Sequence, residues 1–581
     1  MRAETFPLLL DWGTPLAVPP AFIFFATAML IALLRGESHL LIKRILLVLT
    51  PIVGLWNLTT LSMGASWSIG VLDFELVQLR VDRLSLLFGL LFHLGAFLGV
   101  IYALRVRDNT QHVAALVYAG SALGAVFAGD LISLFFYWEG MAVASAFLVW
   151  ARRTPESVGA GMRYLVIHLA SGLLLLAGAL LHFHTTGQIT FDYVGLGQIE
   201  GWLILAAFGI KCGFPLVHNW ITDAYPQSTP SGTVFLSMFT TKVAVYALAR
   251  GFPGAEILVI VGTAMAVFPI FYAVIENDLR RVLGYSMINQ IGFMVVGVGV
   301  GTELALNGAV AHAFNEVMFK GLLFMTMGAV LLRVRHVNGS DLGGLYKSMP
   351  LTATLCVIGA ASISAFPLFS GFVSKSMIMT AMIAEGHEIL WLALLFASAG
   401  VFHHAGIKIP YFAFFARDSG IRVREAPWNM LLAMTLAASL CIFSGTHYAT
   451  LYSLLPWEVD YLPYTGSHVL IQLQLLTFSA LAFAWLKLQG IYPPELHSVN
   501  LDAEWVYRRL GTRLVGWAFG TIGKASAGIR DGARSEITAL GSRLLGRRGV
   551  LTAEAATGNS ALWVGILLLG YLFFYFFARS G

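Results

Sequence analysis

The chain has 581 residues, of which 58% are hydrophobic and only 12% are charged. Soluble domains are about one quarter charged, so this chain has too little charge to cover a water-soluble protein of 63.1 kDa. The composition excludes an ordinary soluble enzyme and predicts an integral membrane protein. The formal net charge of +5 is the excess expected of loops that set membrane topology, and the sequence has no motif for binding nucleic acid.

Apolar stretches of roughly 20 residues, each long enough to cross a bilayer, recur along the chain and predict an all-α polytopic fold with about 14–16 transmembrane helices. The first has no signal-peptide layout, so we expect it to be retained. The stretch at 350–384 is too long for one straight span and contains Pro367 and Gly371, which predicts a broken helix. The spans are expected near 15–34, 42–63, 84–104, 112–129, 131–151, 160–184, 202–221, 230–250, 255–275, 281–300, 305–333, 350–384, 389–415, 428–446, 468–489 and 561–578.

Lysines and arginines fall in alternate loops, which predicts the orientation of the chain in the membrane. The loops after the odd-numbered spans are basic, and the loops between them are nearly free of basic residues. The positive-inside rule then places the basic loops in the cytoplasm and the N-terminus outside. The basic residues include Arg105, Arg107, Arg152, Arg153, Arg280, Arg281, Arg333, Arg335 and Lys347.

Residues 490–560 differ from the rest of the chain. Pro493, Pro494 and Glu495 are expected to leave the membrane, and residues 502–548 alternate basic and apolar side chains at rough helical spacing. This pattern predicts an amphipathic helix lying laterally on the cytoplasmic face of the lipid bilayer, with a solvated basic linker as the alternative. A last span then anchors the C-terminus.

Five ionisable side chains fall inside predicted spans, where each costs several kcal/mol unless it is paired or hydrated. An amine in an apolar interior releases its proton more readily, and a nearby carboxylate favours the protonated form. A row of such lysines, joined by water and by His312 or Glu316, predicts a proton relay. Static ion pairing, snorkelling and helix capping are the structural alternatives. The five residues are Glu139, Lys211, Lys242, Lys320 and Lys375.

Two short repeats interrupt spans close to buried lysines. Residues 214–216 and 366–368 both read Phe-Pro-Leu, and breaks at Pro215 and Pro367 expose backbone polar groups that can hold water. Paired broken helices indicate an inverted-repeat transporter. We expect His403 and His404, beside Lys408, to be core or interface residues. Asp130 and Asp223 are expected to be solvated caps, and Cys212, Cys356 and Cys441 to be core residues.

Several motifs together resemble the antiporter-like family of Mrp-type sodium/proton antiporters and the proton-pumping membrane subunits of respiratory complex I. The resemblance covers roughly residues 80–420. It rests on residues 81–85 (Val-Asp-Arg-Leu-Ser), Trp138-Glu139, residues 211–230 beginning Lys-Cys-Gly-Phe-Pro, residues 241–250, residues 278–286 (Asp-Leu-Arg-Arg-Val-Leu-Gly-Tyr-Ser) and residues 370–375 (Ser-Gly-Phe-Val-Ser-Lys). The segment 502–509 resembles extended bacterial relatives of the Mrp D-type protein.

The resemblance implies two inverted five-helix repeats and a lateral proton pathway, with relay roles for Glu139, Lys211, Lys242, Lys320 and Lys375. Two positions depart from the family pattern. Leu236 stands where the complex I subunit with a long lateral helix usually has histidine, and Glu316 replaces a frequent histidine of the His-x-x-Asn-His pattern. The expected parts are N-terminal helices (1–104), two repeats (105–250 and 251–420), core helices (421–489), the amphipathic helix (490–560) and the terminal span (561–581).

We therefore expect a proton-translocating subunit of a multi-subunit monovalent cation/proton antiporter, similar to the D-type component of Mrp antiporters, in the cell inner membrane. It would work with other membrane subunits and move protons, with Na+ as a possible second ion, and it needs no cofactor. One alternative is a pump module of a complex I-like or membrane hydrogenase complex. Another is an anchor for a soluble catalytic partner. The chain lacks cysteine or histidine sets for iron–sulfur or haem ligation, which argues against a redox enzyme.

Overall fold

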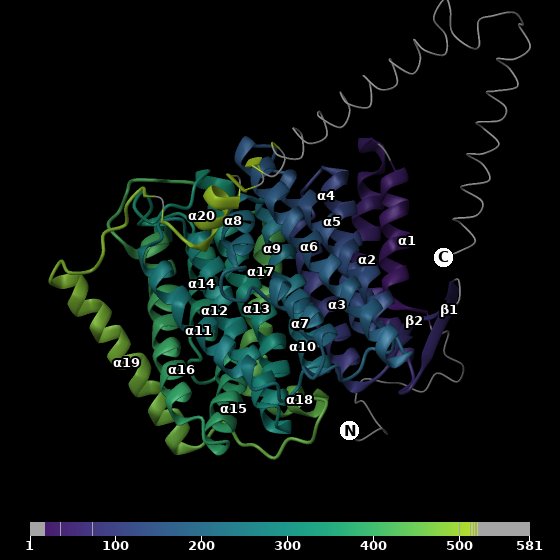
Figure 1. Cartoon of the computed structure of the whole chain (residues 1–581). Helices are drawn as coiled ribbons and strands as arrows, with labels where there is room; N and C mark the ends of the chain where they lie inside the picture. The colour runs from purple at the N-terminus through teal and green to yellow at the C-terminus, as the bar shows by residue number, and fades with distance from the viewer. Residues whose placement is uncertain are drawn as a thin grey trace, which may run out of the picture. The chain divides into compact units, whose positions relative to one another are not determined.

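The computed structural model describes residues 18–34, 36–71, 74–498, 500–511, 513–514, 516–517 and 520. They form an almost entirely helical protein with one β-hairpin (Figure 1). In these ranges, twelve helices are long and apolar enough to cross a membrane. The predicted polytopic all-α fold is therefore confirmed, while the expected span at 561–578 and most of the expected amphipathic helix lie outside the described residues.

The helices of the first half alternate direction and pack as neighbours, as α4 does against both α1 and α5. Asp82, Asp108 and Asp130 accept backbone N–H groups at the starts of α3, α4 and α5, which fixes where these helices begin. The elements are α1 (Pro20–Leu33), η1 (Glu37–His39), α2 (Leu40–Thr60), β1 (Ser66–Val71), β2 (Phe74–Arg80), α3 (Arg83–Ala103), α4 (Asn109–Phe127), α5 (Leu131–Trp150), α6 (Pro155–Thr186), α7 (Ile199–Cys212), α8 (Asn219–Gln227), α9 (Pro230–Met238) and α10 (Thr240–Gly251).

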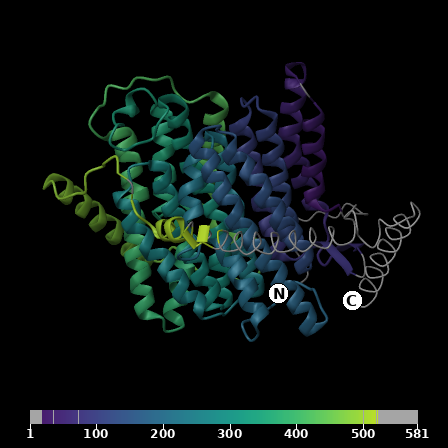
Figure 2. The same cartoon turned by 45° about the horizontal axis from the view of Figure 1, so that its top comes forward.

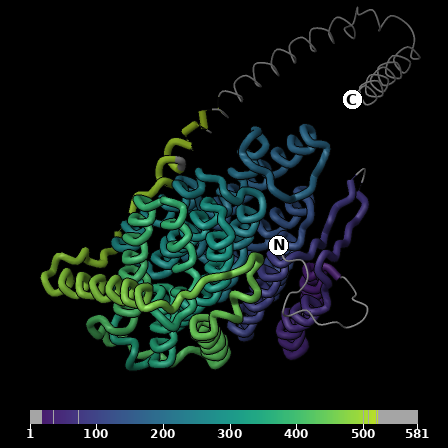
Figure 3. Tube along the Cα trace, turned by 90° about the horizontal axis from the view of Figure 1, so that it is seen from below, coloured from purple at the N-terminus to yellow at the C-terminus, as the bar shows by residue number. Residues whose placement is uncertain are grey.

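The second half continues the same way, and α19 leans outward from the helices beside it (Figures 1 and 3). Its elements are α11 (Ile257–Ile275), α12 (Leu279–Val300), α13 (Glu303–Val334), η2 (Leu345–Lys347), α14 (Pro350–Ile363), α15 (Ser370–Ala384), α16 (Glu388–Val401), the π-helical η3 (Phe402–Lys408) and η4 (Tyr411–Phe415), α17 (Trp428–Thr446), α18 (Tyr448–Leu454), α19 (Gly466–Leu488), α20 (Ala503–Val506) and η5 (Tyr507–Gly511). The described residues up to 501 form one compact unit, and the described residues after 501 belong to a second one.

The basic loops gather at one end of the first unit, which we call the basic end. Arg153 at the α5–α6 turn pairs with Asp108 at the start of α4, at 3.2 Å. Arg280 at the start of α12 donates to the carbonyl oxygens of Pro226 and Ser228, at 3.0 Å each, at the end of α8 and just after it. Turning the molecule brings these loops toward the viewer (Figure 2). Basic loop residues are therefore concentrated at this end, as expected of a protein with fixed orientation in a membrane, although Arg80, Arg83 and Arg250 lie at the other.

Two stretches of the unit share one order of elements but run in opposite directions. The order α4, α5, α6, broken α7–α8 and broken α9–α10 recurs as α11, α12, α13, broken α14–α15 and α16 with its π-helical continuation. An isolated β-bridge joins Asp130 to Thr190 in the first stretch, and another joins Asp278 to Asn338 in the second. Both members of the second bridge lie 148 positions after their counterparts (278 minus 130, and 338 minus 190). Because α4 starts at the basic end and α11 at the other end, the stretches are inverted.

Both predicted helix breaks are present, and their backbones match. After Pro215 and after Pro367 the chain places a leucine in the left-handed region, with φ of 73° at Leu216 and 77° at Leu368. Left-handed backbone is costly for a residue other than glycine, so the packing around each break holds it in place. Gly371 closes the second break, because a Cβ there would lie 2.0 Å from the Ser362 carbonyl oxygen.

Some elements differ from the prediction. The stretch at 230–250 is two helices, divided where Phe239 has φ of −113° and ψ of −68°. The stretch at 389–415 changes to π-helix after Val401. The hairpin of β1 and β2 falls between spans, where we expected only a loop.

Candidate functional site

Four lysines lie inside the helical bundle rather than in the basic loops. The Lys211, Lys242 and Lys320 side chains are 0% exposed, and Lys375 is 3% exposed. They come from α7, α10, α13 and α15, three of which adjoin a helix break. Burying four amines in an apolar interior demands specific polar neighbours for each, and the structure supplies different ones at each position.

Lys211 lies beside Glu139, but its nearest acceptor is backbone. Its Nζ donates to the carbonyl oxygen of Trp138 and lies 4.4 Å from the centroid of the Trp138 ring. Glu139 lies within electrostatic range of Lys211, while its Oε1 has no hydrogen-bond partner among the described residues. A Cβ at Gly172 would lie 1.5 Å from this oxygen, so glycine makes room for the carboxylate.

Lys242 forms a direct ion pair with Glu316, and both side chains are fully buried. The Lys242 Nζ also donates to the Ser237 carbonyl oxygen, at 2.8 Å. That carbonyl belongs to the last turn of α9, so the division at Phe239 leaves it available to the amine. The unpredicted helix break thus supplies one oxygen and Glu316 another.

Lys320 and His312 lie on the same helix, α13, and contact its neighbours α12 and α15 in the second inverted stretch. Lys320 Nζ donates to Ser286 Oγ at 2.8 Å. His312 Nδ1 lies 2.9 Å from Ser374 Oγ, and its Nε2 lies 3.2 Å from Gln290 Oε1. Glu316 lies within electrostatic range of Lys320 as well as pairing with Lys242. The predicted shared face of His312, Glu316 and Lys320 therefore exists, and Glu316 occupies its centre.

Lys375 ends the row and borders a cavity. Its Nζ has no hydrogen-bond partner among the described residues and lies 4.8 Å from the centroid of the Phe293 ring. The cavity has a volume of about 180 Å³, and its wall includes Ser376, Thr380 and Gln472. A cavity of that size with hydroxyl and amide groups can hold several waters. The amine is therefore the member of the row best placed to exchange protons with water.

Other polar groups belong to this row although the sequence did not single them out. His168 on α6 is fully buried, has no hydrogen-bond partner for either ring nitrogen among the described residues, and lies within electrostatic range of Lys211. Gln290 holds His312 and donates to Asn289 Oδ1 at 2.7 Å. In the sequence, each of these residues is a polar side chain inside an apolar span. Such a residue stands out less when it is uncharged than when it is a lysine.

The structure also tests the expectation that Asp130 and Asp223 are solvated helix caps. Asp130 does cap α5, but it is 1% exposed rather than solvated and also accepts the backbone N–H of Val77 at 2.7 Å. Burial raises the pKa of this carboxyl above its ordinary value. Asp223 is not a cap: it lies within α8 and pairs with Arg163 at 2.7 Å. The three cysteines are free and buried, as expected, and the described residues contain no group of three or more potential metal ligands.

Comparisons with known proteins agree with this arrangement. Residues 128–401 match the family model "NADH:quinone oxidoreductase/Mrp antiporter, TM". Those residues contain Glu139 and the four lysines of the row. The predicted resemblance to the antiporter-like family is confirmed.

Relatives and solved structures in this family belong to several kinds of complex. The chain is 27% identical over 418 residues to hydrogenase-4 component B of Escherichia coli, covering 64% of this chain and 62% of that protein. It is 28% identical over 316 residues to the D component of the Na(+)/H(+) antiporter of Alkalihalophilus pseudofirmus, covering 51% of this chain and 64% of the relative. The chain thus spans less than two thirds of the length of each.

A solved structure extends the likeness beyond the matched core. A chain of the membrane-bound sulfane sulfur reductase, an archaeal respiratory membrane complex, superposes with a TM-score of 0.70 at 22% identity, covering 96% of this chain and 100% of that one. At this identity the likeness shows a shared fold. The chain is therefore a multi-pass membrane protein with the antiporter-like fold.

Proposed function

We propose that this chain is the proton-translocating subunit of a multi-subunit monovalent cation/proton antiporter, similar to the D-type component of Mrp antiporters. The observation that supports it is the row of buried amines, of which only Lys242 has a directly paired carboxylate among the described residues. Packing alone does not explain such a row, because apolar residues of similar volume pack as well without the desolvation cost. Proton transfer between neighbouring groups does explain it.

In this proposal the relay consists of Glu139, Lys211, Lys242, Lys320 and Lys375, with His312 and Glu316 at its centre. Glu316 is the pivot because it lies between two amines, pairing with Lys242 and within range of Lys320. A shift of its carboxylate toward one amine stabilises that ammonium and destabilises the other. A charge arriving at one end of the row can therefore load one lysine and unload its neighbour.

The proposed setting is the cell inner membrane, with the basic end in the cytoplasm and other membrane subunits as partners. The positive-inside rule supports the orientation. A second candidate, a pump module of a complex I-like or hydrogenase-type complex, is favoured by the alignment with hydrogenase-4 component B and by the near-complete superposition on a chain of the sulfane sulfur reductase. The same relay serves either complex. The third reading, an anchor for a soluble catalytic partner, assigns the charges to packing only.

Transport by the full complex in inverted membrane vesicles tests the proposal, with a pH-sensitive dye reporting collapse of an imposed pH gradient. Lys211→Ala is expected to lower the rate at least about 100-fold, a loss typical of removing a proton-transfer group. Lys347→Ala is the matched control, because Lys347 is half exposed and pairs with Asp418 on the surface. Unchanged transport in Lys211→Ala, with the protein present at its normal level, would favour the anchor. Dependence of the rate on Na+ or K+ separates the antiporter from the redox-driven pump.

A further inference from the structure

A second buried ion pair lies apart from the four-lysine row. Lys408, the last residue of η3, is fully buried, and its Nζ lies 2.9 Å from Glu495 Oε1. The same amine donates to the carbonyl oxygens of Val274 and Glu276, each at 2.7 Å. An ammonium has three N–H donors, so these three oxygens satisfy it completely. The site therefore provides an acceptor for every N–H group of a protonated Lys408.

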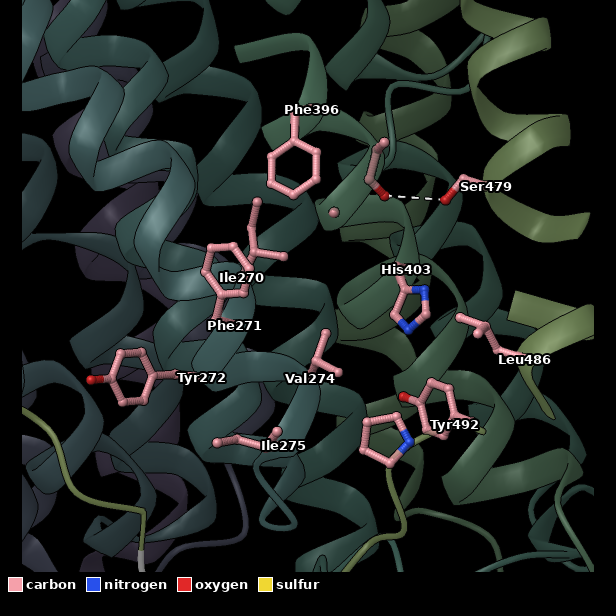
Figure 4. Close-up of a pocket in the computed structure, with 13 residues that line it drawn as sticks. Ile270, Phe271, Tyr272, Val274, Ile275, Phe396, His403, Ser479, Leu486 and Tyr492 are labelled. Carbon is pink, nitrogen blue, oxygen red and sulfur yellow. Dashed lines mark hydrogen bonds between the residues drawn. The ribbon is translucent and has the colours of Figure 1, made fainter. Parts of the chain in front are cut away.

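Glu495 reaches this site from a segment that we call the strap, residues 491–498 and 500 after α19. Its anchors to the rest of the unit are side chains. Tyr492 stacks on His403 with ring centroids 5.5 Å apart (Figure 4). His497 Nε2 lies 3.0 Å from Asp341 Oδ1, and Asn500 Nδ2 donates to Glu276 Oε2 at 3.2 Å. Both contacts are at the basic end.

Tyr492 is buried and also packs against Phe412 and Phe483, so the strap is pinned at its start, while the part after Tyr492 is held mainly by side chains. Among the described residues, its backbone hydrogen bonds run only within the strap and to Leu486 at the end of α19. Beneath Tyr492 and Pro493 is an open cavity of about 740 Å³, bounded by α11, α16 and α19 (Figure 4). Segments held by few side-chain contacts open at low free-energy cost. The part of the strap after Tyr492 can therefore lift while Tyr492 and the helices below it stay packed.

His404 connects this site to the four-lysine row. It is fully buried, and it lies within electrostatic range of both Lys320 and Lys408. Neither of its ring nitrogens has a hydrogen-bond partner among the described residues. Buried polar groups are normally satisfied by protein or ordered water, so a water beside this ring would complete a path between the two lysines.

Building on the proposed function, we propose that His404, Lys408 and Glu495 form a branch of the relay that opens at the basic end, with the strap as its gate. With the strap closed, the Lys408 ammonium passes a proton to the Glu495 carboxylate. One N–H bond breaks, one O–H bond forms, and both groups become neutral. With the strap lifted, Glu495 releases the proton to water at the basic end, and the branch refills from Lys320 through His404.

The charges around Lys408 suit this exchange. Glu276 and Glu495 face it from α11's end and the strap, while His403, His404 and Lys487 face it from η3 and α19. Burial raises the pKa of Glu495 above its ordinary value, and Lys408 opposes that rise. The carboxyl is thus readily neutral when the amine is neutral. Lifting the strap exposes it to water and restores the carboxylate.

Transport by the full complex in inverted vesicles tests the branch. Glu495→Gln is expected to lower the rate at least about 100-fold, as Lys211→Ala does under the proposed function, and Glu495→Asp to restore most of it. The control is Glu388→Gln, an exposed carboxylate at the other end of the unit. An inactive Lys211→Ala beside a fully active Glu495→Gln overturns the branch and leaves the proposed function standing. Full activity in both overturns both.

A reversible clamp tests the gate without disturbing Lys408 or Glu495. Ser340 Oγ lies 3.3 Å from His497 Nε2, so cysteines at these two positions can be joined by a short, cleavable thiol cross-linker. We expect cross-linking of Ser340→Cys/His497→Cys to lower transport at least about tenfold and reduction to restore it. Both single-cysteine variants should be indifferent to the reagent. Undiminished transport through the clamped chain overturns the gate.

Discussion

The ion pair between Lys242 and Glu316 allows stability and transport to be separated. Both side chains are fully buried, so removing one partner leaves an uncompensated charge in the interior. Glu316→Leu is expected to cost about 3–5 kcal/mol of stability. Replacing both partners, as Lys242→Met/Glu316→Leu, removes the charge altogether. Apolar replacements of buried pairs are often neutral or stabilising by about 1–4 kcal/mol, so the double variant should recover the stability lost by the single one.

Transport should behave differently from stability. The relay needs an exchangeable proton at this point, so the double variant is expected to remain at least about 100-fold slower than the wild type although it is stable. Thermal unfolding in detergent and pH-gradient collapse in vesicles give the two measurements on one preparation. A double variant that transports normally would refute the relay. One that stays as unstable as Glu316→Leu would refute the electrostatic argument and indicate a packing defect.

Two further predictions concern the helix break and the outer end of α3. Gly371→Ala should destabilise the protein by about 1–3 kcal/mol, because the added methyl meets the Ser362 carbonyl at 2.0 Å, whereas Gly466→Ala, with nothing within 4 Å, should not; equal melting temperatures would contradict this. Burial opposes the charged form of Asp82, but Arg250 and a backbone N–H at the start of α3 outweigh it and hold the pKa of the carboxyl below its ordinary value. The difference in free energy of unfolding between the wild type and Asp82→Asn should therefore be constant from about pH 5 to 8 and shrink below about pH 4. A difference that grows on acidification would contradict the pairing.

The sequence predicted the buried lysines because charge is conspicuous in an apolar span. Glu139 and the four lysines were all selected on that ground, and the structure buries the lysines. The breaks at Pro215 and Pro367 were equally visible, because proline removes a backbone donor and distorts a helix. The membrane class followed from composition alone.

Other features left no local signal. The division at Phe239 occurs in a Phe-Thr-Thr sequence with no proline or glycine, and tertiary packing imposes it. The Lys408–Glu495 pair joins residues far apart in the chain, and Glu495 follows two prolines that suggested an exit from the membrane. The sequence also did not show that Glu316 pairs with Lys242, since Lys320 on the same helix was the nearer candidate by spacing. Long-range pairing was thus the part that only the fold could decide.

The inverted stretches place their charges at one common contact, though on different helices. In the first stretch the acidic group is Glu139 on α5, and Gly172 on α6 makes room for it. The position 148 residues after Gly172 is Lys320 on α13, which contacts Ser286 on α12 at 2.8 Å. The carboxylate of one stretch and the amine of the other therefore occupy matching contacts between matching helices. In the proposed relay, the same passing charge would therefore meet a carboxylate at this contact in one half and an amine at the matching contact in the other.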